Sequence, residues 1–417
     1  MRDMVMMFIQ NPNPAFISST WRNPTPLLST QKKCRSWSPS FFLLSPLLLF
    51  LLLYAHHLSV LGAGFAGLSV AWNLLQHGSR ESHLCVDIYD EVGIGGGASG
   101  VAGGLLHPYS PKGPYHHSTC LALLLLLAFS SFFGGAECWN ETLNLLHIAE
   151  ECSELYCQLQ NRAIHEEAAQ SLVPNLSVPL NLVFFMPEAL NINAQSYLEG
   201  LYLACQNLAN DMSTSGHVHR ELHFHQESVQ SLLDLAVFLP ELSGKLPLRT
   251  CRGIITHLQL GDDIREEYPK HSPSILSDAW LAVHGARHMD LGSTWDWKSM
   301  NYSRNVTTDE ASKAMEVLLP KASSVYPAIK NWTVTGAVGG LRAMPPLTAD
   351  GSLPLLGCIN DYVDGSQTCK YWLFTGLGAR GLLFHGWLGK LLAQAVLSHD
   401  ENLIPFELTS WKHKLHQ

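Results

Sequence analysis

Three glycines, Gly62, Gly64 and Gly67, have the GxGxxG spacing of a loop that binds the pyrophosphate of a dinucleotide. In such a loop the first glycine permits a tight turn, the second lets the backbone approach the phosphates, and the third lets the following helix pack closely on the preceding strand. The amino end of that helix would point free amide groups and the positive end of its dipole at the phosphates. The predicted contact residues are Gly62, Ala63, Gly64, Phe65, Ala66 and Gly67.

The elements that must position this loop are also visible in the sequence. Residues 59–61 are apolar like a buried strand, apolar side chains recur at helical spacing from Leu68 to Leu75, and residues 84–89 form a second strand-like run. Asp90 ends that run, at about the 20-residue distance at which an acid accepts the ribose hydroxyls of a dinucleotide. Because these features occur in the required order, a nucleotide site is favoured over an ordinary glycine-rich turn.

A second glycine-rich segment, GGGASGVAGGLLHP, occupies residues 95–108. It resembles the GASG-type segment that lies along the flavin in the FAD-dependent oxidases of the D-amino acid oxidase and glycine oxidase superfamily. Within that superfamily the chain is similar to plant proteins that resemble the FAD oxidase half of the bacterial bifunctional enzyme that makes 5-methylaminomethyl-2-thiouridine in tRNA. The resemblance implies FAD as the cofactor, with contacts at Gly97, Ala98, Ser99, Gly100, Gly104 and Leu105.

The resemblance extends toward the carboxyl end of the chain. Residues 340–357, GLRAMPPLTADGSLPLLG, are similar to the family signature RP-x-TPDG-x-P-x-G, in which Arg342 would hold a substrate carboxylate through two parallel hydrogen bonds. An ion pair at the domain seam is the structural alternative for Arg342. A strand at 371–375 and the turn GLGARG at 376–381 follow, and the resemblance places this turn beside the flavin ring. The implied contacts are Gly376, Gly378, Ala379, Arg380, Gly381 and Leu382.

The implied fold is α/β, with a Rossmann-like, doubly wound FAD/NAD(P)-binding domain and a mainly antiparallel β-sheet substrate domain. The FAD-binding domain would comprise residues 58–160, 189–245 and 335–410, with an apolar insert at 114–133 and a helix at 137–156. The substrate domain would comprise residues 161–188 and 246–334, with strands at 250–259, 280–283 and 288–294. The family turn over the adenine side of FAD is missing from the sequence near residue 236, which puts the affinity for FAD in question.

The implied activity is oxidation of a C–N bond in an amino acid or secondary amine. Hydride would pass to the flavin, the imine would hydrolyse, and oxygen or another acceptor would take the electrons. This reaction needs an aligned neutral amine more than a side-chain base, and no catalytic side chain is assigned. Histidines 107 and 385 lie in segments expected near the flavin, and a structural role is favoured for both. Two alternatives stay open: a nicotinamide-dependent dehydrogenase, and an inactive or misfolded product of an incompletely spliced transcript.

Composition restricts the partners. A net charge of −9 argues against broad nucleic-acid binding, although the family makes a modified tRNA base a possible substrate.

The 10 cysteines include no CxxC pair, so free thiols are favoured over a disulfide framework or a zinc site. Ligands along one strand do not converge by themselves, so a solvated strand face is favoured over a metal site in one polar run. That run comprises His217, His219, Glu221, His223, His225 and Glu227.

The first 57 residues have the character of a targeting leader followed by an apolar run. Residues 1–40 are basic and rich in hydroxyl side chains, with Asp3 as the one acid, which indicates transit to a plastid or, alternatively, a mitochondrion. The apolar run at 41–55 is shorter than the ~20 residues of a spanning helix and contains Pro46, so stable membrane insertion is not expected. This run and a similar one at 120–133 are interpreted as translated intron ends, with a buried helix as the alternative for the second.

Overall fold

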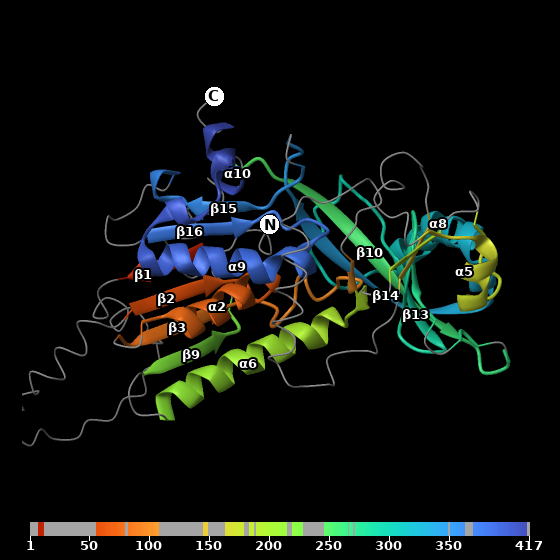
Figure 1. The fold of residues 1–417 in the computed structure, drawn as a ribbon, viewed down its shortest axis with the longest axis horizontal. Coiled ribbons are helices and arrows are strands. Elements are labelled where there is room, and N and C mark those ends of the chain that lie inside the picture. Colours follow the sequence, from red (N-terminus) through yellow and green to blue (C-terminus); the bar gives the residue numbers. More distant parts are fainter. Residues whose placement is uncertain are drawn as a thin grey trace, which may run out of the picture.

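The computed structural model describes residues 7–11, 56–79, 82–107, 145–148, 163–178, 183–186, 189–214, 219–227, 246–265, 267–269, 272–348, 351–362 and 370–414. These residues form two bodies, one built on a six-stranded sheet and one on an eight-stranded sheet (Figure 1). The long strands β10 (Arg249–Leu260) and β14 (Trp332–Met344) extend from the middle of the molecule into the second body. Helix α6 (Ala194–Thr214) lies along the first body and begins close to the second.

The six-stranded sheet contains the predicted strand–loop–helix–strand unit. Its order is β15 (Leu355–Cys358), β16 (Lys370–Thr375), β1 (Met7–Asn11), β2 (His56–Leu61), β3 (Leu84–Tyr89) and β9 (Arg220–His225). Strands β2, β3 and β9 are mutually parallel, while β1 runs antiparallel to both β2 and β16. The strands expected at 59–61, 84–89 and 371–375 are confirmed. Strand β1 was not expected, because it belongs to the segment that was predicted to be a targeting leader.

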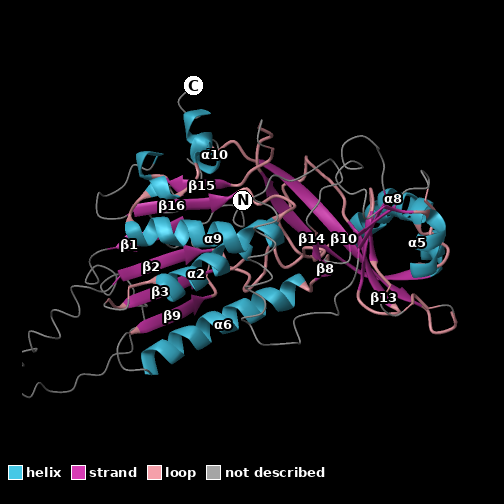
Figure 2. Ribbon diagram, in the orientation of Figure 1, coloured by secondary structure: helices cyan, strands magenta, loops and turns pink. Residues whose placement is uncertain are grey.

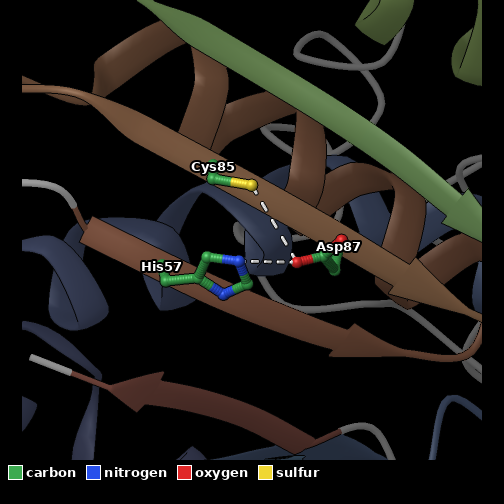
Figure 3. Close-up of side chains that lie close together, drawn as sticks. All are labelled: His57, Cys85 and Asp87. Carbon is green, nitrogen blue, oxygen red and sulfur yellow. Dashed lines mark hydrogen bonds and ion pairs between the residues drawn. The ribbon is translucent and has the colours of Figure 1, made fainter. Parts of the chain in front are cut away.

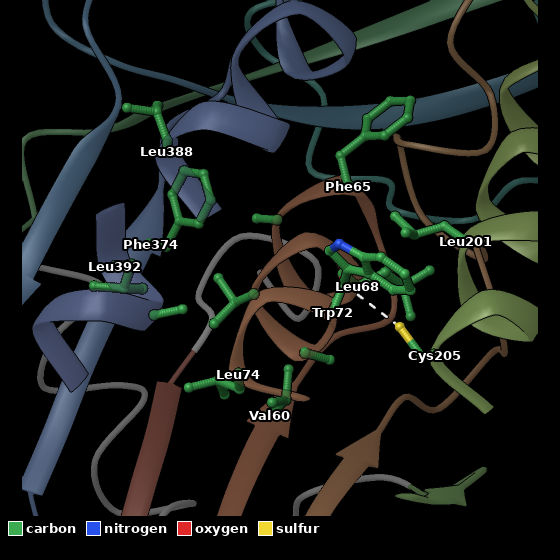
Figure 4. Packing of buried hydrophobic residues seen from close by; sticks show 14 of the residues in the cluster. Val60, Phe65, Leu68, Trp72, Leu74, Leu201, Cys205, Phe374, Leu388 and Leu392 are labelled. Carbon is green, nitrogen blue, oxygen red and sulfur yellow. Dashed lines mark hydrogen bonds between the residues drawn. The ribbon is translucent and has the colours of Figure 1, made fainter. Parts of the chain in front are cut away.

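Helices α2 (Phe65–His77), α6 and α9 (Gly381–Ser398) cover one face of this sheet. Alternate residues of β2 and β3, such as Val60 and Ile88, are fully buried in one apolar cluster. Figure 4 shows Val60 of this cluster with Leu68 of α2 and Leu392 of α9. Packing between α2 and α9 is tight, because a Cβ on Gly389 would collide with Ser69. In the described part of the chain these three helices share one face of the parallel strands, so the domain is Rossmann-like, as expected, but has there one helix layer rather than the two of a doubly wound sheet.

The eight-stranded sheet forms the second body. Its order is β14, β10, β13 (His288–Gly292), β12 (Trp280–Val283), β11 (Ser274–Leu276), β5 (Leu145–Ile148), β7 (Val183–Met186) and β6 (Ala163–Ile164). Every neighbouring pair is antiparallel except β11 and β5, which confirms a mainly antiparallel substrate domain. Helices α5 (Glu166–Leu172) and α8 (Thr308–Val325) pack on its outer face, as Figure 2 shows. A capping box between Thr307 and Glu310 begins α8.

Smaller elements complete the described fold. Strands β4 (Leu105–Leu106) and β8 (Leu190–Asn191) pair with each other where the two bodies meet. Short helix α10 (Phe406–Thr409) packs on β15 near the carboxyl end, where Trp411 Nε1 donates a hydrogen bond to Leu356 O. None of the helices in the described ranges is both long and apolar enough to cross a bilayer.

Some expected domain boundaries differ from the structure. Strand β5 lies inside 137–156, where a helix was expected, and belongs to the substrate sheet rather than to the FAD-binding domain. Strand β14 also belongs to the substrate sheet, so the FAD-binding domain does not resume at residue 335. The strands expected at 250–259, 280–283 and 288–294 are confirmed as β10, β12 and β13. The apolar runs at 41–55 and 114–133 and the segment near residue 236 lie outside the described residues.

Candidate active site

The GxGxxG loop joins β2 to α2 in the geometry that the sequence predicts. Gly62 has φ 96°, which favours glycine, and its amide donates a 2.7 Å hydrogen bond to Tyr89 O at the end of β3. Gly64 is the N-cap of α2 and has no side chain that could cap the first amides of the helix. A Cβ on Gly64 would lie 2.7 Å from Ser99 Oγ. The arrangement therefore combines a helix terminus that its own N-cap residue leaves uncapped with a close backbone approach, as pyrophosphate binding requires.

Asp90 holds this loop in place. Its Oδ2 accepts a 2.8 Å hydrogen bond from Ala63 N, and its Oδ1 accepts 3.0 Å hydrogen bonds from Val92 N and Gly93 N. One carboxylate thus ties the loop to the turn after β3. Its role toward ribose stays a prediction, whereas its role in fixing the loop is visible.

The second glycine-rich segment folds directly against the first. Ser99 Oγ accepts a 3.1 Å hydrogen bond from Phe65 N, and Gly95 N donates a 3.0 Å hydrogen bond to Ala63 O. A Cβ on Gly100 would collide with Gly95 O, so this turn is compact enough to require glycine. Residues 62–67 and 95–100, separated by a helix and a strand in the sequence, therefore form one continuous backbone surface.

This surface docks on the inner face of the substrate sheet, the face that carries Ile255, Val338 and Gly340. A Cβ on Gly340 would lie 2.9 Å from Ala98 Cα, and a Cβ on Gly103 would collide with the Trp280 ring. Gly104 has φ 74° and accepts a 3.0 Å hydrogen bond from Ile192 N, which leads into the β4–β8 pair that contains Leu105. The residues of the GASG segment therefore lie between the two bodies.

The turn GLGARG joins β16 to α9 and reaches the same place. Gly376 and Gly378 have φ 73° and 59°, and Gly378 N donates a 2.9 Å hydrogen bond to Ala343 O at the end of β14. A Cβ on Gly381 would lie 2.9 Å from the Phe65 ring, so the amino ends of α9 and α2 touch. The turn includes Ala379 and Arg380, and α9 then buries Leu382. All three glycine-rich segments of the sequence therefore converge.

Arg342 lies on β14 next to this convergence, but its guanidinium is occupied by protein groups. Its Nη2 donates a 2.9 Å hydrogen bond to Thr294 O, and the guanidinium carbon lies 4.1 Å from the centre of the Trp295 ring. Weaker contacts of 3.4 Å reach Ser293 Oγ and Cys251 O. Among the described residues no carboxylate pairs with Arg342, so the ion pair considered as its structural alternative is replaced by backbone and aromatic contacts.

A small cavity adjoins the GASG segment, with a volume of about 120 Å³. It is bounded by residues 100–103, by the start of α6 and by the inner face of the substrate sheet, including His257, His284 and Asp290. Asp290 Oδ1 lies 2.6 Å from His257 Nδ1, and its Oδ2 lies 3.0 Å from His284 Nε2. The cavity therefore has an acidic group that is paired with two imidazoles at its substrate-sheet wall.

The hydrogen bonds between Asp290 and the two histidines shift the pKa values of this cluster. Burial alone would raise the pKa of Asp290, but the hydrogen bonds with His257 and His284 lower it to about 2. The hydrogen bond with Asp290 raises the pKa of His257 above its usual range, against the opposing effect of burial. Sequence reasoning missed this cluster, because His257 and Asp290 face each other only through the register of β10 and β13.

His385 has a structural role, as favoured from the sequence. It is fully buried in α9, its Nδ1 lies 2.9 Å from Leu382 O, and its Nε2 lies 2.8 Å from the Tyr197 hydroxyl oxygen. Since a carbonyl oxygen only accepts, Nδ1 donates and Nε2 accepts from Tyr197. Burial lowers the pKa of His385 to about 4, so the ring stays neutral and packs beside Phe65 at the start of α2. His107 is half-buried after β4.

The family of the chain follows from comparison with known proteins. Residues 57–395 match the DAO family of FAD dependent oxidoreductases. The matched region spans both bodies and all three glycine-rich segments, and the protein belongs to this family. Its cofactor is therefore FAD, and the loop amides, the Gly64 approach and the GASG segment fit a dinucleotide. The chain is thus placed among flavin enzymes rather than nicotinamide-dependent dehydrogenases.

Solved structures share the fold at low sequence identity. Glycine oxidase from Geobacillus kaustophilus matches with a TM-score of 0.59 and 16% identity, over 84% of this chain and 96% of that one. L-proline dehydrogenase from P. horikoshii matches with a TM-score of 0.60 and 12% identity, over 85% and 97%. Iminodiacetate oxidase from Chelativorans sp. BNC1 matches with a TM-score of 0.56 and 17% identity, over 83% and 96%.

One curated relative matches over a short segment. A Rhizobium etli protein named as a thiamine biosynthesis oxidoreductase, ThiO, is 51% identical over 52 residues. The segment is 12% of this chain and 14% of the relative, so this chain spans only a small part of that protein's length in the match.

Proposed function

We propose that this protein oxidises a C–N bond of a small amino acid or secondary amine. The observation that carries the proposal is the convergence of the three glycine-rich segments with Arg342 on the inner face of the substrate sheet. Relatives of the same fold are named as oxidases or dehydrogenases of amines and amino acids, which agrees with this substrate class. FAD, when bound, supplies the acceptor for the hydride from the carbon beside the amine.

The residues of the chain would bind and orient the reactants. The amides at the start of α2 would hold the pyrophosphate, and the GASG segment would present the flavin to the inner face of the substrate sheet. Arg342 would exchange its contact with Thr294 O for a substrate carboxylate, because its planar fork matches a carboxylate with two parallel hydrogen bonds. Trp295 would keep the guanidinium oriented during that exchange.

The small cavity beside the GASG segment favours a small substrate. Its volume of about 120 Å³ is a little below the ~150 Å³ of an engineered cavity that binds benzene, so it suits a ligand of only a few non-hydrogen atoms. The ionised Asp290 at its wall would attract a cationic amine, and the paired imidazoles of His257 and His284 would limit that attraction. Oxygen or another acceptor would then reoxidise the flavin.

The experiment is anaerobic reduction of the purified, FAD-loaded protein by single amines. Glycine, N-methylglycine, D-alanine and L-proline would be mixed with the protein, and loss of the flavin absorbance band would be followed. Reduction by at least one amine, and none by NADH or NADPH, supports the proposal. Full flavin loading without reduction by any amine would reject it. A folded protein that takes up no FAD would instead favour the inactive product of an incompletely spliced transcript.

We also propose that residues 1–40 direct the protein to a plastid, with a mitochondrion as the alternative. The supporting observation is their basic, hydroxyl-rich and acid-poor composition. Fusion of residues 1–57 to a fluorescent protein and imaging in plant cells tests this directly. Uniform cytosolic fluorescence would reject it, and fluorescence along membranes would assign residues 41–55 a membrane role.

A further inference from the structure

We propose that His57, Cys85 and Asp87 form a binding site for a zinc-type divalent metal ion on the face of the six-stranded sheet that α2 does not cover. Figure 3 shows the three side chains pointing toward one another from β2 and β3. The parallel register pairs His57 with Cys85 and Ser59 with Asp87, so two neighbouring strands supply the three groups. The site lies near the start of β2, at the opposite end of that strand from the pyrophosphate loop.

The distances suit a metal ion. Asp87 Oδ2 lies 3.0 Å from His57 Nε2 and 3.9 Å from Cys85 Sγ, and all three ligand atoms lie within 4.8 Å of one another. Zinc with bonds of about 2.0–2.3 Å in a tetrahedral arrangement separates its ligand atoms by about 3.3–3.8 Å. Small side-chain movements therefore bring all three atoms to bonding distance. Imidazole, thiolate and carboxylate together favour zinc over the hard cations magnesium and calcium.

A second layer of contacts prepares Asp87 for this role. His225 on β9 lies with its Nε2 2.7 Å from Asp87 Oδ1, and its ring stacks on Tyr89 at a centroid distance of 4.5 Å. The carboxylate is thus held by one oxygen and presents the other toward His57 and Cys85. Metal-binding residues are commonly oriented by such outer hydrogen bonds, which also raise the basicity of the ligand.

Acidic side chains beside the thiol also favour a cation. Asp87 lies next to Cys85 on β3, and Glu221 is its register partner on the neighbouring strand β9. On metal binding the proton of Cys85 would leave to solvent and the thiolate would bond to the ion.

A competing trio shares the same thiol. Cys85, Glu221 and His223 also bring three ligand atoms within 4.8 Å. The side chains of Glu221 and His223 are 52% and 49% exposed, whereas that of Asp87 is 8% exposed. Ordering two exposed side chains costs more rotamer entropy, so the buried trio is favoured. The ligand atoms of His57, Cys85 and Asp87 come together because they lie on two neighbouring strands, whereas residues along one strand do not converge.

The test measures zinc on the purified, full-length, FAD-loaded protein. Protein equilibrated with zinc sulfate and passed through a desalting column is expected to retain one zinc ion per chain by elemental mass spectrometry. His57→Ala and Cys85→Ser are expected to lose it, and Cys358→Ser is the matched control, since Cys358 is another half-buried free thiol. X-ray absorption at the zinc edge of the unmodified protein is expected to show one sulfur ligand, which requires no variant. Flavin content and circular dichroism report folding.

Three results would overturn the assignment. The first is folded, flavin-loaded protein that retains no zinc. The second is retention that is unchanged in Cys85→Ser, or a zinc edge without sulfur. The third is loss of zinc in His223→Ala together with retention in His57→Ala, which would place the ion on the competing trio.

Discussion

The backbone amide of Phe65 donates a 3.1 Å hydrogen bond to the hydroxyl oxygen of Ser99. The first residue of α2 is therefore joined to the GASG segment, and the side-chain oxygen occupies a position at the helix terminus that suits an anion. This bond locks together two glycine-rich segments that the sequence separates by a helix and a strand. The same Phe65 ring contacts the start of α9 at Gly381, so one residue links all three segments.

Gly64→Val is expected to abolish FAD retention. A Cβ at this position would lie 2.7 Å from Ser99 Oγ, and a branched side chain would fill the space where the pyrophosphate approaches. The measurement is the ratio of flavin to protein absorbance after purification. Gly336→Val on β14 is the matched control, because a Cβ there has only an ordinary contact of 3.5 Å with His257. Undiminished flavin in Gly64→Val would contradict the loop assignment.

Arg342→Lys is expected to keep FAD binding and to lower kcat/KM for amino acids roughly ten-fold or more, because lysine cannot form the planar fork. Amines without a carboxylate should be affected far less. Arg249→Lys is the matched control, since Arg249 lies 4.7 Å over the Trp297 ring as Arg342 lies over Trp295. Equal turnover of every substrate by the Arg342 variant and the unmodified protein would show that Arg342 serves only structure.

Acid should weaken the fold through Asp290. Its pKa of about 2 lies below the ~3.9 of an unfolded chain, so its contribution is present above about pH 4 and is lost as the pH falls toward 2. The raised pKa of His257 acts oppositely: its contribution is present below about pH 6.5 and is lost as the pH rises through the folded pKa. Their joint contribution is therefore greatest between about pH 4 and 6.5.

The check is urea unfolding of Asp290→Asn across this pH range. The variant is expected to lose on the order of 2 kcal/mol of unfolding free energy near pH 6, and less near pH 3. Asp278→Asn, which removes an exposed partner of Lys321, is the control and should change little. If Asp290→Asn lost the same unfolding free energy at every pH, the ionised pair of Asp290 and His257 would not be the source of that loss.

Removal of residues 1–55 is expected to preserve a folded flavoprotein. Because β1 is antiparallel to both β2 and β16, those two strands are parallel to each other and can pair directly once β1 is gone. Flavin content and the melting temperature would be compared with the full chain. Ile9→Pro in the full chain is the companion variant, since proline removes a ladder hydrogen bond. If both changes destroy flavin binding, β1 is an essential strand and a cleaved leader is ruled out.

The local pattern of the sequence predicts many of the strands and helices of this fold, because glycine spacing and the periodicity of apolar residues indicate them. The spacing of Gly62, Gly64 and Gly67 and the apolar strands around them give the first unit, and strands β10, β12 and β13 are recognisable by their apolar runs. Strand β5 was mistaken for part of a helix, since a short apolar run does not distinguish the two. Strand β14 was assigned to the wrong domain because the family signature begins within it.

Side-chain clusters depend on strand order and register, which a single sequence does not reveal. His257 meets Asp290 only because β10 pairs with β13, and His57 meets Asp87 only because β2 pairs with β3. The role of Arg342 toward substrate stays a prediction, and its present partners, Thr294 O and Trp295, lie in a loop that no sequence pattern marks.

The most direct measurement is the absorbance spectrum of the purified protein, first as isolated with FAD and then after anaerobic addition of a small amine. The account predicts flavin bands in the first spectrum and their bleaching in the second, with oxygen or another acceptor restoring them. A folded protein that shows flavin bands but is bleached by no amino acid or secondary amine would contradict the proposed C–N oxidation. A folded protein without flavin bands after incubation with FAD would contradict the site itself.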